Sequence, residues 1–464
     1  MPENVNPLYT PNIPIPIEGK IRENLEQQQT MFNVLVSDIH QKADYFAKQG
    51  IHAVKDSYGD IVPGVICLDT GKAGKSSSVI AMTHTNEPCG LSAQHELLQS
   101  WMAGNRPKSG KVYLMIGGNV AQGKVFFNRI LDDKRAMTNS EISEYRGIKD
   151  INFNRIPERL LATSTPLNAD EKRILQLREI FAKCEGSVLD LHSLSTQADP
   201  IAIAALSKYD DMEIKSSLSK LIERMPVVNV LVDMTKRMNG FMLSRIGSLR
   251  GENVPMVIEA GGPHIASHVA KNSTDCCNAW LENVAGWSQT KQYYDNTIAY
   301  YHPQIEPLLT PDSAKALKQS LPNEEALKAV RSDSFILIQG PETLEDASYW
   351  TSDASKKAAA DIAKNEGHTL KSGRLLNFAY VEKGEPLMVG QQTGHVIRAR
   401  ESGFLLMGPA NPVISPDQKE SYILSAKNPE KEKTLHLDER SNVSTKMVDK
   451  LMAEKAALPL ARAI

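Results

Sequence analysis

The residues best suited to chemistry in this chain stand where apolar runs end. His84 and Glu87 lie three residues apart, directly after the run SVIAMT. At a turn between a strand and a helix, an imidazole and a carboxylate with this spacing can face one ion, and zinc accepts both ligand types. The H-x-x-E pattern is weak on its own. The alternative is a polar cluster at a helix start, with Glu87 near the positive end of the helix dipole.

Two further polar residues end apolar runs later in the chain. His192 closes the run SVLDLH and is a natural third ligand, which Asp190 can orient from behind. Glu259 closes the run PMVIE and precedes two glycines, so it can take a proton from an activated water and return it to a leaving amine. The alternatives are a histidine of the core and a carboxylate satisfied by backbone amides.

A third group of candidates is basic. Arg155 offers a planar fork that suits a substrate carboxylate, and Asn154 before it adds an amide donor. Arg146 lies nine residues before Arg155. On composition alone, a solvated loop is the better account of this group.

These residues need a scaffold, and the apolar runs around them alternate with amphipathic segments. Such alternation predicts an α/β sheet covered by helices on both faces, in which ligands bind at the carboxyl ends of the strands. The expected strands are 64–68, 78–84, 111–118, 187–193, 200–206, 228–234 and 255–262, and the expected helices are 91–102, 169–184, 211–225 and 264–287.

The chain divides into three expected parts. Residues 1–49 read as a proline-rich arm followed by a helix, and 50–300 as the catalytic α/β domain. Residues 301–464 read as a linker segment and a smaller C-terminal β-rich domain, because short apolar runs punctuated by glycine begin near residue 370.

The composition excludes several classes of protein. Lys plus Arg is 53 and Asp plus Glu is 55, so the net charge of −2 argues against a generally basic nucleic-acid binder or a polybasic membrane protein. The five cysteines form no C-x-x-C pair, which favours a reducing compartment. The N-terminus is not that of a signal peptide and no run of 18 apolar residues occurs, so we expect a cytoplasmic protein without a membrane span.

Taken in order, the segments THTNEPCG, FNRIP, DLHS and PMVIEAGGP resemble the succinylglutamate desuccinylase/aspartoacylase family of metallocarboxypeptidase-like deacylases. The resemblance covers roughly residues 75–290, and KGEPLMVG with GHVIRARESGFLLMG is similar to that family's C-terminal β-domain. It implies an α/β fold with a zinc-carboxypeptidase-like mixed sheet flanked by helices, and a smaller C-terminal β-rich domain. It also implies that His84, Glu87 and His192 bind one Zn²⁺ per chain, with Glu259 as general base and then general acid.

The resemblance further implies a set of residues that hold the substrate. They are Asn154, Arg155 and Arg250 for a carboxylate, and Arg146 for the scissile carbonyl. The chain departs from the family at three points. Gly147 stands at the strict position of the carbonyl arginine, Arg250 is offset by one residue, and Asn152-Phe153 replaces the usual Asp-Leu before the N-R pair.

The implied activity is hydrolysis of the amide bond of a small N-acyl amino acid, with no nucleic-acid or membrane partner. Two alternatives stay open: a zinc carboxypeptidase that acts on peptides, and a catalytically silent binding protein that keeps the fold. A homo-oligomer is compatible with each of them.

Overall fold

The computed structural model describes most of the chain between residues 14 and 427. The described residues are 14–132, 136–147, 151–157, 159–183, 188–195, 200–204, 225–227, 229–232, 243, 255–284, 297–302, 322–338, 341–366, 380–382, 384–398, 403–406, 413–414 and 424–427.

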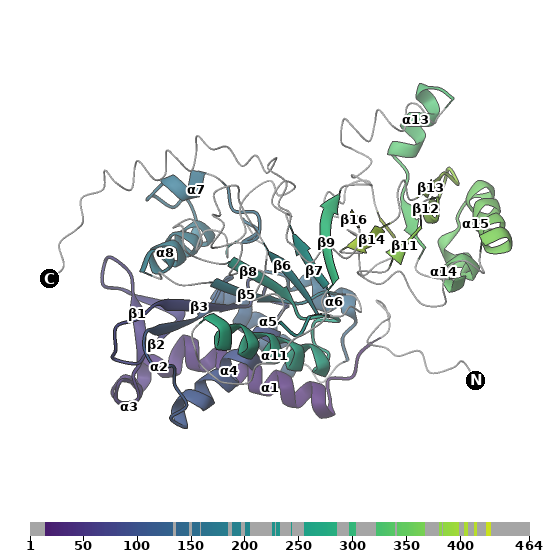
Figure 1. Cartoon of the computed structure of the whole chain (residues 1–464). Helices are drawn as coiled ribbons and strands as arrows, with labels where there is room; N and C mark the ends of the chain where they lie inside the picture. The colour runs from purple at the N-terminus through teal and green to yellow at the C-terminus, as the bar shows by residue number, and fades with distance from the viewer. Residues whose placement is uncertain are drawn as a thin grey trace.

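Within these residues, twelve strands form one mixed sheet in the order β1-β2-β4-β3-β5-β8-β6-β7-β9-β16-β14-β11 (Figure 1). Their bounds are β1 (Ile51–Lys55), β2 (Ile61–Asp69), β3 (Ser76–Ala81), β4 (Lys111–Ile116), β5 (Val188–His192), β6 (Ile201–Ala204), β7 (Asn229–Val232), β8 (Pro255–Glu259), β9 (Thr297–His302), β11 (Tyr380–Val381), β14 (Gly403–Leu406) and β16 (Leu424–Lys427). The neighbours β4, β3, β5 and β8 are parallel, whereas β2 and β6 run antiparallel to β4 and β8. All seven strands expected from the apolar runs are present, and the sheet gains β1, β9, β11, β14 and β16 in addition.

Helices cover both faces of this sheet, as the alternation predicts. The helical segments are α1 (Gly19–Asn33), the π-helical η2 (Val34–Asp38), α2 (Ile39–Gln41), α3 (Ala43–Lys48), α4 (Cys89–Met102), α5 (Val120–Asp132), α6 (Asn139–Glu144), α7 (Arg159–Ala162), α8 (Ala169–Lys183) and α11 (Ser267–Val284). In Figure 1, α1, α4 and α11 lie on one face and α7 and α8 on the other. Trp101 of α4 and Trp280 of α11 are buried on the first face, and Phe181 of α8 on the second. The expected helix 211–225 lies almost wholly outside the described residues.

A second, antiparallel sheet of four described strands lies in the C-terminal part, in the order β13-β12-β10-β15. It comprises β10 (Phe335–Leu337), β12 (Pro386–Gly390), β13 (Val396–Arg398) and β15 (Val413–Ile414), accompanied by α13 (Glu324–Arg331), α14 (Pro341–Glu345), the 3₁₀ turn η4 (Ala347–Tyr349) and α15 (Asp353–Glu366). The expected α/β fold with a smaller C-terminal β-rich part is therefore confirmed. None of the described helices is both long and apolar enough to cross a membrane.

The parallel register of three strands brings the candidate residues together. Ala81 at the end of β3 pairs with Leu191 of β5, and His192 pairs with Glu259 of β8. Because these strands run parallel, their carboxyl ends form one edge of the sheet. The turn that carries His84 therefore begins beside His192 and Glu259.

Candidate metal centre

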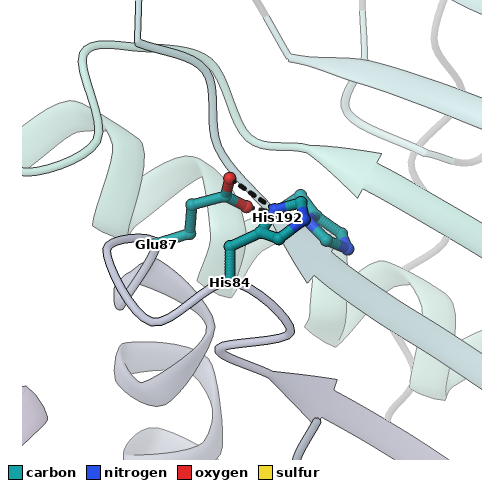
Figure 2. Close-up of side chains that lie close together, drawn as sticks. All are labelled: His84, Glu87 and His192. Atoms are coloured by element: carbon teal, nitrogen blue, oxygen red, sulfur yellow. Dashed lines mark hydrogen bonds and ion pairs between the residues drawn. The ribbon is translucent and has the colours of Figure 1, made fainter. Parts of the chain in front are cut away.

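Three buried side chains converge at this edge (Figure 2). His84 Nδ1 lies 2.8 Å from Glu87 Oε1, and His192 Nδ1 lies 2.7 Å from Glu87 Oε2. One ligand atom from each residue falls within 4.8 Å of the others, and this is the one such group of three among the described residues. His84 and Glu87 come from the turn after β3, and His192 ends β5. The structure thus joins the three predicted metal ligands.

The ring edge of His84 that faces away from Glu87 is held by an amide. Its Nε2 lies 3.2 Å from Asn152 Oδ1, and this oxygen also accepts a hydrogen bond of 2.9 Å from the backbone N–H of Asn154. The backbone donor identifies the atom as the amide oxygen, so Nε2 of His84 must be the donor in the first contact. Nδ1 of a neutral His84 then presents its lone pair to Glu87.

The ring of His192 also has a polar group behind it, in this case the carboxylate of Asp190. Its Nε2 lies 3.2 Å from Asp190 Oδ2, while the other carboxylate oxygen accepts a hydrogen bond of 2.8 Å from the Thr83 hydroxyl. Burial opposes a charge on His192, yet Asp190 and Glu87 raise its pKa well above the usual range. Burial likewise opposes ionisation of Glu87, but His84 and His192 hold its pKa well below the usual range.

This electrostatic pattern favours a cation at the point where the three residues meet. The Nδ1 atoms of both imidazoles and an ionised carboxylate face one another, and a cation bound between them would balance the negative charges of Glu87 and Asp190. Two imidazoles and one carboxylate, with the imidazoles oriented by outer acceptors, are a donor set of catalytic zinc sites. The residues present therefore fit zinc.

The turn that aims His84 depends on close backbone contact with the end of β4. Met82 has φ of 51°, a left-handed conformation that is rare for a residue with a side chain. Its carbonyl accepts a hydrogen bond of 2.9 Å from Gly118 N. A Cβ on Gly118 would lie 2.7 Å from the Met82 and Thr83 carbonyl oxygens, so glycine is required there.

Glu259 stands beside the cluster with an uncommitted oxygen. Its side chain is buried, and its Oε2 has no hydrogen-bond partner within the described part of the chain. Burial raises the pKa of Glu259 to about 7, although His192 and Arg146 act in the opposite direction. A carboxyl group with a pKa near neutrality is suited to accept and return a proton.

Arg146 is tied to the turn between His84 and Glu87. Thr85 N donates a hydrogen bond of 3.1 Å to the Arg146 carbonyl, and the Thr85 hydroxyl donates to the Tyr145 carbonyl. Burial lowers the pKa of His84, which Glu87 opposes, and the Arg146 guanidinium lowers it further. The charge of Arg146 therefore acts on the centre.

Position 147 has little room for a side chain. Gly147 has φ of +75°, and a Cβ built on it would lie 2.5 Å from Thr85 Oγ1. A side chain at position 147 would therefore require Thr85 to shift.

The remaining predicted substrate residues are only partly at the centre. Asn154 is buried, and its Nδ2 lies 3.3 Å from His192 Nε2. Arg155 is half-buried and donates from Nη1 to the Asn154 carbonyl over 2.8 Å. Asp170 of α8 anchors this loop through Ile151 N at 3.4 Å. Arg250 lies outside the described residues.

Sequence reasoning missed four residues around the centre. They are Thr85, which holds the Arg146 loop; Asn152, behind His84; and the buried pair Ser193 and His264, whose Oγ and Nδ1 are 3.0 Å apart. The signals were present for the first two, because Thr85 lies inside the H-x-x-E segment and Asn152 is one of the departures from the family pattern. Nothing local links Ser193 with His264, which are 71 residues apart.

Comparison with known proteins gives matches by structure alone. No protein-family model matches the sequence, and no curated protein matches it. A succinylglutamate desuccinylase/aspartoacylase from Rhodobacter sphaeroides matches with a TM-score of 0.48 at 10% identity, over 82% of this chain and 95% of the other. A succinylglutamate desuccinylase from Vibrio cholerae gives 0.47 at 12% identity, over 84% and 94%. The product-bound ectoine utilization protein EutE (DoeB) from Ruegeria pomeroyi gives 0.46 at 13% identity, over 81% and 92%. Structural neighbours of the chain thus include proteins of the family that its sequence motifs resemble.

Proposed function

We propose that this chain is a zinc-dependent hydrolase that removes the acyl group from a small N-acyl amino acid. The observation that carries the proposal is the convergence of His84, Glu87 and His192, each buried, with Asn152 Oδ1 behind His84 and the Asp190 carboxylate behind His192. Such a centre leaves a fourth coordination position for water or substrate.

The other residues of the site supply the steps of an amide hydrolysis. Zinc, when bound, lowers the pKa of water and polarises a carbonyl group. Glu259 accepts the proton of the attacking water and returns it to the nitrogen as the C–N bond breaks. Arg146 stabilises the negative charge that develops on the carbonyl oxygen. The products are a carboxylic acid and an amino acid with a free amine.

The proposed substrate class follows from the basic residues that the family resemblance assigns to the substrate. We expect Asn154, Arg155 and Arg250 to hold a carboxylate of the substrate, since guanidinium groups bind carboxylates in a bidentate manner. Together with Arg146 they would make a cationic pocket in a chain whose net charge is −2. This combination suits an acidic small molecule.

The proposed location is the cytoplasm. The cysteines within the described residues, Cys67, Cys89, Cys276 and Cys277, are all buried and unpaired. Burial raises the pKa of the Cys89 thiol to about 12, so it is expected to stay a protonated part of the core. Thiols of this kind suit a reducing compartment.

The decisive experiment combines metal analysis with a substrate panel. The full-length chain is expected to carry one zinc ion, to lose hydrolysis of N-acetyl or N-succinyl amino acids on chelation, and to regain it with added zinc. His84→Ala should lower the zinc content, whereas His95→Ala, at an exposed contact with Gln27, should leave it unchanged.

Three outcomes would contradict the proposal. Activity that chelators leave untouched would remove the metal. Cleavage of peptides without any cleavage of N-acyl amino acids would favour the carboxypeptidase. Full zinc loading with no turnover of either substrate class would favour the silent binding protein.

A further inference from the structure

A third histidine, His264, lies beside the proposed metal centre with no assigned role. It follows Glu259 by five residues, after the Gly-Gly-Pro turn, and its side chain is buried. Its Nδ1 lies 3.0 Å from the hydroxyl of Ser193, the residue that directly follows His192. Ser193 is itself fixed to the centre, because its backbone N–H donates to Glu87 Oε2 over 3.3 Å.

The chemistry around Ser193 decides which ring nitrogen of His264 carries the proton. The Ser193 hydroxyl has two nearby acceptors, His264 Nδ1 and the sulfur of Cys89. A thiol sulfur is a weak acceptor and an imidazole nitrogen is a strong one. Ser193 therefore donates to Nδ1, and the proton of the neutral imidazole sits on Nε2.

The surroundings keep this imidazole neutral. Burial lowers the pKa of His264 to about 4; Glu87 opposes the shift, and the charge of Arg146 adds to it. His264 therefore lies within electrostatic range of Glu87, Arg146 and both ligand histidines. The described hydrogen bond of the ring uses Nδ1, so its other edge offers an N–H group.

We propose that His264, held in one tautomer by Ser193, is a substrate-contacting residue that donates its Nε2–H to a carbonyl or carboxylate oxygen of the molecule bound at the metal. The inference rests on the metal centre of the proposed function, but it applies to any oxygen ligand there. It adds a neutral donor to the charged donor Arg146, and it limits the occupant to one with an acceptor oxygen on the His264 side.

The test uses two substitutions, each of which keeps a polar group near one of the two ring nitrogens of His264. His264→Gln retains a donor near the position of Nε2, and His264→Asn retains a group near Nδ1 that can still bond Ser193. The probe is acetohydroxamate, an oxygen ligand for zinc, titrated into the zinc-loaded full chain. Zinc content and thermal unfolding are measured for each variant, with His95→Gln as the matched control for loss of an imidazole elsewhere.

We expect His264→Asn to bind acetohydroxamate about 10- to 100-fold more weakly at full zinc content, since a hydrogen bond to a charged partner is lost. His264→Gln should lose less than His264→Asn, and His95→Gln should match the wild type. The inference is overturned if His264→Asn binds like the wild type, if it binds better than His264→Gln, or if zinc-loaded wild type does not bind acetohydroxamate.

Two further measurements test the role of His264 if its variants do not fold or if the chain hydrolyses no N-acyl amino acid. If the His264 variants do not fold, Ser193→Ala carries the test, because it keeps the ring and removes the group that fixes its tautomer; unchanged acetohydroxamate affinity in that variant overturns the inference. A zinc-loaded wild type that binds acetohydroxamate but hydrolyses no N-acyl amino acid refutes the proposed function alone, and the binding series still decides the role of His264.

Discussion

The two sides of the candidate metal centre are built in different ways. On one side, His192 and Glu259 sit on paired strands, and His192 has the carboxylate of Asp190 behind it. On the other, His84 sits on a turn, and its outer partner is the neutral amide of Asn152, which comes from a loop. The strand side is therefore set by the register of the sheet, whereas the turn side is set by contacts between loops.

The two sides also carry different proposed functions. The strand side carries the proposed general base, Glu259, and the charged group Asp190, whose positions follow from β5 and β8 alone. The turn side carries Arg146, whose position depends on Thr85. We expect substitutions on the strand side to affect chemistry and metal affinity directly, and those on the turn side to act through loop geometry.

The largest effect is expected on the strand side, at Glu259. Glu259→Gln keeps the shape of the side chain but removes its ability to accept a proton, so kcat should fall about 10²- to 10⁴-fold. Zinc content should be unchanged, because Glu259 is not among the three converging ligands. Near-wild-type turnover in a steady-state assay would exclude Glu259 as the base.

The matching change on the turn side is Arg146→Met, which removes the charge and keeps much of the length. Loss of one group that stabilises an oxyanion typically costs about 10²- to 10³-fold in kcat. We expect this loss with little change in KM. A change confined to KM would mean that Arg146 binds the substrate in its ground state. The turn side would then not contribute to the chemical step.

The outer partners of the two histidines allow the most direct comparison. Substitution of such partners typically costs about 10- to 100-fold in metal affinity. We expect Asp190→Asn to lie near the upper end and Asn152→Ala near the lower, because only Asp190 contributes a charge. Competition titrations with a zinc chelator measure both. A larger loss in Asn152→Ala would reverse the proposed ranking.

The smallest effect is expected in stability, at Gly147. Gly147→Ala places a methyl group against Thr85 at a positive φ, and should lower the free energy of unfolding by about 1–3 kcal/mol. Gly59→Ala is the matched control, since it has φ of +85° with nothing within 4 Å. The turn-side contact is refuted if the two variants unfold at the same denaturant concentration.

The strand side could be predicted from the sequence. β3, β5 and β8 are continuous apolar runs, and each is followed or ended by a residue that can ligate or transfer a proton, so their coincidence at one edge of a parallel sheet follows from general rules. The helices α4, α8 and α11 could also be predicted, because apolar residues recur in them at helical spacing.

The turn side could not be predicted in the same way. Asn152 and Thr85 are ordinary polar residues in sequence, and their roles arise from contacts across 60 to 68 residues. On the strand side, His264 was missed for the same reason, since its contact with Ser193 spans 71 residues. The positive φ of Gly147 and its lack of room against Thr85 are likewise properties of the folded loop. The substrate roles of Arg155 and Arg250 stay predictions.

The continuity of the large sheet has a consequence for how the chain can be shortened. β9 pairs with β7 on one side and with β16 on the other, so strands from the C-terminal part complete the sheet that begins with β1. A chain cut after His302 would leave one side of β9 as a bare row of backbone donors and acceptors. Exposed edges of this kind recruit other chains, so the truncated protein should self-associate rather than remain a smaller working unit.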